Sequence, residues 1–457
     1  MAFETGVASD YRDFYRKLVT FLTQNSELVA AGDQWQLTRG FMDPDIDYID
    51  SVQYVINGPL NWDVSSAMGH DDSYSNVVEK SGERKIGWVA RLVNAPNFIG
   101  FKSSTAVSPT YYTVTAEDWL GTTNTSSRQP KSWDIQYSDD NVAWATSDTV
   151  TDQTGWSPFE ERQFLITETT PHKFWRLYVT ANNGDGTYVA IGRLRFYDAV
   201  DRWISRGWTN EHMFRLNGFA GTDPAFCGMR LHINQNAHYN IEWMGATCHD
   251  PELGWETQPH QIQDRYSPLW EFDMQYWFVA NGHRMICVMH VDERWIAASM
   301  GKFLPYGAVG QYPYTMLISG SRNSPISWVQ EDSASHLQAP AQDHPGTYVY
   351  HPNNQSWIAL QNRDYQGGLI GGSNVLSPTI SGGMGVGNRQ LPNGAYVLAP
   401  YIIEIGDRAY GQLDGMRWVS GDNQKSGDIL DVCGQDWLIF HNQQYTGISD
   451  FAALELK

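Results

Sequence analysis

PKSWDIQYSDDNVAW, residues 130–144, is the stretch that decides the fold. Apolar and polar residues alternate through its first half, which is the pattern of a strand with one buried face, and a Ser-Asp-Asp-Asn run follows. The stretch therefore predicts a β-hairpin with its turn at 139–141. We expect Trp133 and Trp144 to flank this hairpin and to fill the space between two packed sheets.

The composition is that of a mostly β protein. The 457 residues include 19 Trp, 24 Tyr and 41 Gly, a mixture that favours strands and turns over helices. The length suggests roughly two to four domains. A formal net charge of -20 leaves no basic face for phosphates, so nucleic acid is not an expected partner.

Cysteine usage and the N-terminus indicate where the chain is made. Cys227, Cys248, Cys287 and Cys433 are widely spaced and include no CxxC pair, so buried free thiols are expected rather than a disulfide framework. The first residues contain no apolar signal region, and no apolar run is long enough to span a membrane. These features predict synthesis in a reducing cytoplasm and no membrane span.

The order of patterns along the chain predicts four parts. Apolar residues at helical spacing follow Ser9, a candidate N-cap, and the helical pattern ends at Gly32. Ala280-Asn281-Gly282 separates two apolar strands and predicts a hairpin. The predicted parts are 1–81 (N-terminal helix and first part of a β-rich body), 82–199 (an inserted β-sandwich), 200–340 (second part of the body) and 341–457 (a C-terminal β-rich region).

Residues 110–198 resemble the discoidin-like, factor 5/8 type C family of galactose-binding-like jelly rolls. The resemblance is carried by PKSWDIQYSDDNVAW and by FWRLYVTANNGDGTYVAIGRLRFYD, in that order and at the family's spacing. Residues before Tyr111 do not align with the opening strands of that family. The resemblance implies a jelly-roll sandwich whose loops at one end bind glycans, lipid head groups or proteins, and it carries over no individual ligand residue.

The flanks of this sandwich resemble a family of tailed-bacteriophage virion structural proteins. The resemblance covers much of 1–60 and 200–457 and includes YWFVANGHRMICVMHVDERWIAASMGKFLPY and GQLDGMRWVSGDNQKSGDILDVCGQDWLIF. It implies a part of the virion tail, baseplate or neck that assembles as a symmetric homo-oligomer with other virion proteins. It brings no catalytic motif, and the discoidin-like block becomes an insertion within a virion body.

Two clusters of polar residues are candidate chemical sites. The stretch 248–264 gathers Cys, His, Asp and Glu residues but lacks a metal-ligand spacing, so a solvated loop is favoured and neither metal nor cofactor is predicted. Asp292 and Glu293 could be the paired carboxylates of a glycosidase. Neighbours on a strand point to opposite faces, so a turn is favoured, and a glycan-degrading enzyme with an attached sugar-binding module is the alternative function.

Aromatic and polar residues in the predicted sandwich loops suggest a carbohydrate-binding patch. Sugars stack on indole and phenol faces while amide, carboxylate and guanidinium groups bond their hydroxyls. Core packing is the alternative for Trp119, and turn formation beside Gly186 is the alternative for Asn183 and Asp185. The sequence therefore predicts a non-enzymatic virion protein that displays a jelly roll for host-surface glycans, with candidate contacts at Trp119, Trp156, Asn183, Asp185 and Tyr188.

Overall fold

The structure is a computed structural model, and the chain is mostly β, as the sequence predicts. The residues that it describes are 1–40, 46–50, 88–91, 97–116, 125–158, 160–186, 188–202, 205, 211–217, 224–233, 238–250, 253, 257–307, 314–330, 337, 346–351, 355–362, 373–376, 394–405, 408–441 and 451–456. Within this described part, no helix combines the length and the apolar character needed to cross a bilayer.

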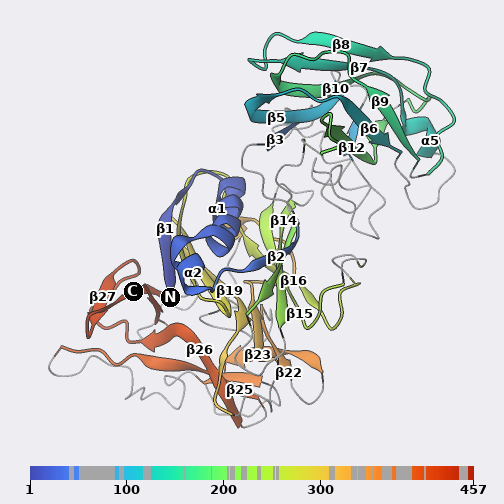
Figure 1. Cartoon of the computed structure of the whole chain (residues 1–457). Helices are drawn as coiled ribbons and strands as arrows, with labels where there is room; N and C mark the ends of the chain where they lie inside the picture. Colours follow the sequence, from blue (N-terminus) through green and yellow to red (C-terminus); the bar gives the residue numbers. More distant parts are fainter. Residues whose placement is uncertain are drawn as a thin grey trace.

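The strands between β3 and β12 form an antiparallel β-sandwich, drawn in teal and green in Figure 1. One sheet has the order β3 (Ile46–Asp50), β5 (Asn97–Val107), β10 (His172–Asn182), β7 (Pro130–Ser138) and β8 (Ala145–Val150). The other has the order β12 (Arg193–Tyr197), β6 (Tyr111–Thr115) and β9 (Glu161–Leu165), while β11 (Tyr188–Ile191) pairs with β4 (Trp88–Arg91). β3 thus belongs to the sandwich although it precedes residue 82, the boundary that the sequence suggests.

The hairpin that decides the fold is present, but its two tryptophans differ. Trp133 is fully buried between the sheets, and its Nε1 donates to the Tyr112 hydroxyl at 2.8 Å. Asp140 closes the turn by accepting the backbone N–H groups of residues 142 and 143. Trp144 is only half-buried, because its ring stacks under the Arg176 guanidinium at 3.7 Å outside the core, so the prediction that it fills the sandwich is wrong.

The remaining strands form the body, whose described residues fall into two sheets. The smaller has the order β16 (Ile262–Pro268), β15 (Tyr239–Ala246), β14 (Ala225–Ile233), β13 (Glu211–Leu216) and β2 (Gln36–Arg39). The larger runs β1 (Ala2–Ala8), β17 (Met274–Ala280), β18 (Arg284–Val291), β19 (Arg294–Lys302), β21 (Met316–Ser319), β22 (Thr347–His351), β23 (Ser356–Asn362), β24 (Ser373–Leu376), β25 (Ala399–Ile405), β26 (Arg408–Val419), β29 (Phe451–Glu455), β28 (Gln435–His441) and β27 (Ile429–Val432), with β20 (Leu304–Pro305) on β26.

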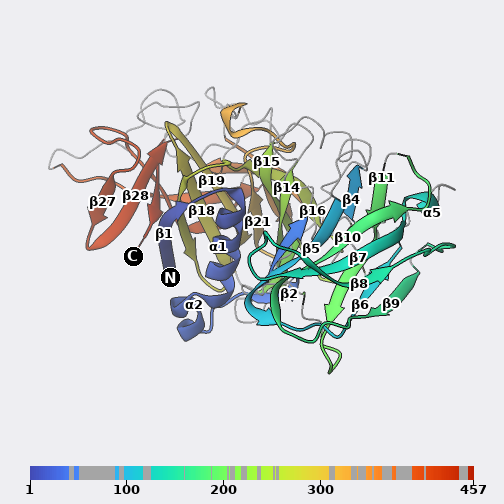
Figure 2. The same ribbon diagram turned by 90° about the horizontal axis from the view of Figure 1, so that it is seen from above.

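β18 is the middle layer of the body and is buried on both faces. Met285, Cys287 and Met289 pack into a core shared with the smaller sheet and the N-terminal helix. Ile286 and Val288 pack on the other side against residues of β25, β26, β28 and β29. Figure 2 shows the helix over one face of this layer and the C-terminal strands β27 and β28 beyond it. Burial on both faces explains why this strand is almost continuously apolar.

The predicted helix is divided in two. α1 (Tyr11–Gln24) is capped by Asp10, whose side chain accepts from the N–H groups of residues 12 and 13, so Ser9 is not the N-cap. Asn25 then caps α2 (Ser26–Ala31), which ends at Gly32 in the left-handed conformation, as the sequence predicts. Further helical segments in the described part of the chain include α5 (Thr125–Arg128) and the short η5 (Trp328–Gln330). The hairpin around 281–283 joins β17 to β18 as predicted.

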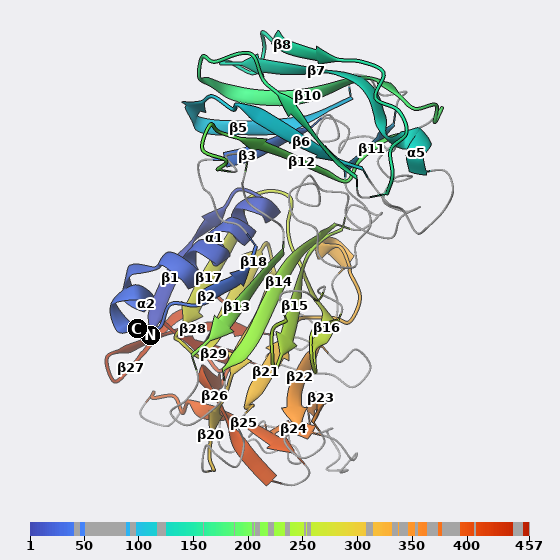
Figure 3. The ribbon, with the colours of Figure 1, turned by 45° about the vertical axis from the view of Figure 1, so that its right-hand side comes forward.

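The sandwich lies between two strands of the body that pair with each other. β2, before it, and β13, after it, are antiparallel neighbours with Met213 opposite Arg39. Arg39 Nε lies 2.9 Å from Glu211 Oε1, and Arg230 lies 3.8 Å from the other oxygen of Glu211. The chain therefore leaves the body and returns to it at adjacent positions, and Figure 3 shows the smaller sheet below the sandwich.

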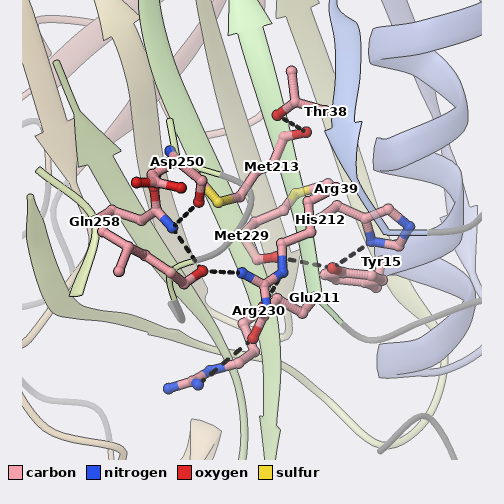
Figure 4. A network of polar contacts seen from close by, with 11 residues as sticks. Tyr15, Thr38, Arg39, Glu211, His212, Met213, Met229, Arg230, Asp250 and Gln258 are labelled. Atoms are coloured by element: carbon pink, nitrogen blue, oxygen red, sulfur yellow. Dashed lines mark hydrogen bonds and ion pairs between the residues drawn. The ribbon is translucent and has the colours of Figure 1, made fainter. Parts of the chain in front are cut away.

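Buried polar groups extend from this point into the sheet (Figure 4). Arg230 bonds the fully buried Glu242 through two nitrogens, at 2.9 and 2.6 Å. Tyr15 of α1 donates its hydroxyl to the Met229 carbonyl and also contacts His212 Nδ1 at 2.8 Å. Burial raises the pKa of Tyr15, which keeps this hydroxyl protonated. The network ties the helix, β13 and β14 together where the insertion begins.

Candidate functional site

Four of the five predicted carbohydrate-binding residues gather at one end of the sandwich, around α5 and the loop between β10 and β11. The backbone N–H groups of Asn183 and Asp185 donate to the carbonyls of Gln129 and Ser127, which brings that loop against the end of α5. Trp119 lies outside the described residues. Asn183, Asp185 and Tyr188 are close in the sequence, and the fold adds Trp156 from a separate loop to this end of the sandwich.

Asn183 holds loops together. Its Nδ2 donates to the carbonyl oxygens of Gln129 at 3.1 Å, Gln153 at 3.0 Å and Pro130 at 3.4 Å. The left-handed residue beside it is Gly184, with φ +108°, and not Gly186. These bonds make the amide a fixed support of the site, as the turn interpretation of this residue anticipates.

Asp185, Arg128 and Tyr188 form the polar and aromatic part of the cluster. Arg128 Nε lies 3.1 Å from Asp185 Oδ2, and its guanidinium lies 4.9 Å from the centre of the Tyr188 ring. Asp185 also accepts the Tyr188 N–H at 2.8 Å. All three side chains are partly exposed, so they can present a carboxylate, a guanidinium and a phenol ring to a ligand.

Trp156 is buried, contrary to the expectation that it is an exposed loop residue. Its exposed fraction is 5%, its Nε1 donates to the Pro130 carbonyl at 3.2 Å, and the Arg162 guanidinium covers its ring at 4.0 Å. Arg162 is held by Glu160 at 2.7 Å, and this hydrogen bond lowers the pKa of that carboxyl. Trp156 is therefore more buried than Trp144. Its ring lies under the Arg162 guanidinium and helps to hold the loop in place.

Sequence reasoning missed the arginines of the sandwich. Arg128 and Arg162 each cover an aromatic ring of the loop cluster. Arg176 stands on the outer face of β10, over the rings of Phe98 and Trp144 at 4.6 and 3.7 Å. The strand pattern could have indicated its orientation. Arg176 lies between two core residues in FWRLYV, and alternation along a strand turns it away from the core.

The candidate catalytic pair and the candidate metal-binding stretch both lie in the body. Asp292 and Glu293 form the tight turn between β18 and β19, as expected, with Asp292 at φ 55°. In 248–264, Asp250 and Gln258 bond each other, while Glu252 and Glu256 lie outside the described residues. Among the described residues, no three His, Cys, Asp or Glu side chains are grouped as a metal site.

Several solved structures are similar to the sandwich. The F5/8 type C domain of a Bacteroides fragilis protein is 13% identical, with a TM-score of 0.26, and the match covers 36% of this chain and 96% of that one. A family 32 module from Clostridium perfringens NanJ, solved in complex with galactose, is 9% identical, with a TM-score of 0.23, and the match covers 34% of this chain and 96% of that one.

A further module of Clostridium perfringens, CpGH89CBM32-5, was solved in complex with GalNAc-β-1,3-galactose. It is 10% identical, with a TM-score of 0.22, and the match covers 35% of this chain and 99% of that one. No known family profile and no curated protein matches the sequence. Likenesses this distant assign no ligand to this chain.

Proposed function

We propose that the protein is a structural component of a tailed-phage virion, in the tail, baseplate or neck, which displays its sandwich to bind host-surface glycans. The observation that carries the proposal is the cluster of Arg128, Asp185 and Tyr188 at the loop end of a domain that leaves and enters the body between paired strands. The resemblance of the flanking sequence to phage structural proteins supplies the virion context.

The cluster suits a sugar because it offers a flat ring beside a donor and an acceptor. Arg128 lies over one face of the Tyr188 ring, so a pyranose would place its C–H face against the opposite face or the edge of that ring while Arg128 and Asp185 bond its hydroxyls. Each such contact is modest, but copies in a symmetric oligomer engage a surface together. The protein then attaches through many low-affinity sites and needs no catalytic step.

The test compares binding of the purified chain and two variants to an array of bacterial-surface glycans. Arg128→Ala and Tyr188→Ala should each weaken glycan binding at least about tenfold, because each removes one face of the site. Arg202→Ala is the matched control, since this arginine of the sandwich is 76% exposed and pairs only locally with Asp198. Equal binding by all four proteins, or release of sugar products, would overturn the proposal.

The virion assignment has a separate test. Antibodies against the chain should label one fixed position on purified phage particles in electron micrographs, in a repeating pattern set by the symmetry of that position. Absence of the chain from purified particles would overturn the virion role while leaving glycan binding by the sandwich intact.

A further inference from the structure

A cleft of about 830 Å³ opens in the body at the ends of strands β17, β18, β19 and β28. A volume of this size lies in the range of small-molecule sites. Its walls come from two distant stretches of sequence, 275–295 and 425–441, which fold together because β17–β19 pack on the C-terminal strands.

The apolar part of the cleft is a stack of rings. Trp295 lies between His290 and Trp277, with ring centroids 4.1 and 5.3 Å apart. Both indoles belong to the core and expose only 4% and 7% of their surface, so an aromatic edge faces the cleft. Gly427 adopts φ +94°, which favours glycine, and a Cβ at this position would be in contact with the Trp295 ring at 3.5 Å.

The charged part of the cleft is balanced. Asp292 and Glu293 supply two carboxylates, while Arg294 and Lys425 supply two cations. This balance gives no net attraction for a phosphate or for another polyanion. No three metal-ligating side chains are grouped among the described residues, so the lining does not form a cation site either. Electrostatics therefore favours a neutral, polar ligand.

The remaining polar groups add neutral donors and acceptors. His441 Nδ1 bonds the Ser426 hydroxyl, and that oxygen also accepts the His441 N–H at 3.0 Å. His290 Nε2 lies 2.5 Å from the carbonyl oxygen of Asp292, which fixes the imidazole against the turn. The turn is what brings Asp292 and Glu293 to one cleft, whereas successive residues of an extended strand would diverge.

We propose that this cleft is a second saccharide site, which binds a neutral oligosaccharide independently of the sandwich. Sugar hydroxyls both donate and accept, and so match a lining that holds two carboxylates, one ammonium and one guanidinium group. The small part of the indoles that Trp277 and Trp295 expose to the cleft gives the apolar C–H face of the sugar a limited contact. The inference goes beyond the proposed glycan binding by the sandwich, because it places a binding site in the body.

The test uses the full chain and an array of neutral and anionic bacterial-surface oligosaccharides, followed by calorimetry with the neutral binders. Glu293→Ala with Lys425→Ala removes one carboxylate and one ammonium from exposed positions and leaves net charge unchanged. Glu27→Ala with Lys173→Ala makes the same change at exposed positions outside the cleft. Arg128→Ala with Tyr188→Ala disables the sandwich site. Thermal unfolding of each variant confirms that it is folded, and Glu293→Gln with Lys425→Met is the conservative replacement.

The expected result is at least one neutral oligosaccharide whose binding weakens about tenfold or more in the cleft variant and is retained in the other two. The proposal is overturned if no neutral oligosaccharide shows this pattern, or if only anionic glycans or peptides bind in the cleft. Binding that is lost only in the sandwich variant overturns it too, while upholding the proposed function. Cleavage of a bound oligosaccharide would overturn the proposal of a binding site and support the alternative of a glycan-degrading enzyme.

Discussion

Arg39, at the end of β2, and Glu211, at the start of β13, form an ion pair with 2.9 Å between Nε and Oε1. Every residue of the sandwich lies between these two positions in the sequence. The pair therefore joins the two strands of the body at the point where the chain leaves for the sandwich and returns from it.

The first prediction is that the body folds without the sandwich. Replacing residues 41–210 by a short linker containing Asn-Gly should leave a soluble protein that unfolds cooperatively, because β2 and β13 already pair. Circular dichroism and urea unfolding measure this outcome. A fragment 46–205 should fold by itself around its own core, which serves as the companion measurement. If neither piece folds, the two regions share a single folding unit and the insertion is refuted.

The second prediction concerns the buried ion pair of Glu242 and Arg230. Glu242→Gln should lower the free energy of unfolding by about 3 kcal/mol, because it removes the carboxylate 2.6 Å from the buried Arg230 guanidinium and leaves Glu211, 3.8 Å away, as a weaker counter-charge. Combining Glu242→Leu with Arg230→Met removes both charges and should recover much of that loss. Arg202→Ala, at the exposed pair with Asp198, should cost less than about 1 kcal/mol. A similar loss in Glu242→Gln and Arg202→Ala would contradict the burial of this pair.

The third prediction separates the four free thiols into two classes. Cys248 and Cys433 are exposed, whereas Cys227 and Cys287 are buried. Burial raises the pKa of both buried thiols, that of Cys287 to about 12, and so suppresses the thiolate that alkylating reagents attack. Mass spectrometry without reductant should find two labels on the folded protein and four after unfolding. Fewer than four labels on the unfolded chain would reveal a disulfide.

The fourth prediction is a loss of stability in mild acid. Burial lowers the pKa of His290 and His441 below the value of 6.5 expected in the unfolded chain. Below pH 6.5 the unfolded chain therefore binds more protons than the folded one, and stability falls as the pH falls. The difference between the urea midpoints at about pH 7 and pH 5 should be smaller in His290→Gln with His441→Gln, while His238 and His249, whose pKa values burial also lowers, keep part of it. An unchanged pH dependence in this variant would assign the acid sensitivity to other groups.

Local patterns in the sequence were enough to predict much of the fold. The β17–β18 hairpin and the helix ending at Gly32 follow from signals within a few residues of each other. The N-cap was placed one residue early because Ser9 and Asp10 are both good caps, and only the backbone geometry separates them.

The candidate site depends more on contacts between distant residues. Trp156 is buried because Arg162 covers it, and Trp144 faces outward because Arg176 offers a surface outside the core. Neither partner could be assigned from spacing. Asp292 and Glu293 line the same cleft as Lys425 because β18 and β19 pack on the C-terminal strands. These residues are more than a hundred positions apart in the sequence, so no local pattern links them.

β1 has a consequence for synthesis on the ribosome. Ala2 pairs with Ala280, so the first strand of the body has no partner until β17 has been translated, whereas every described strand of the sandwich is available by residue 197. At roughly 5–20 residues per second, residues 198–280 take roughly 4 to 17 seconds to emerge. The sandwich can thus complete its core while the apolar face of α1 is still uncovered. Until β17 emerges, cellular chaperones can bind that face.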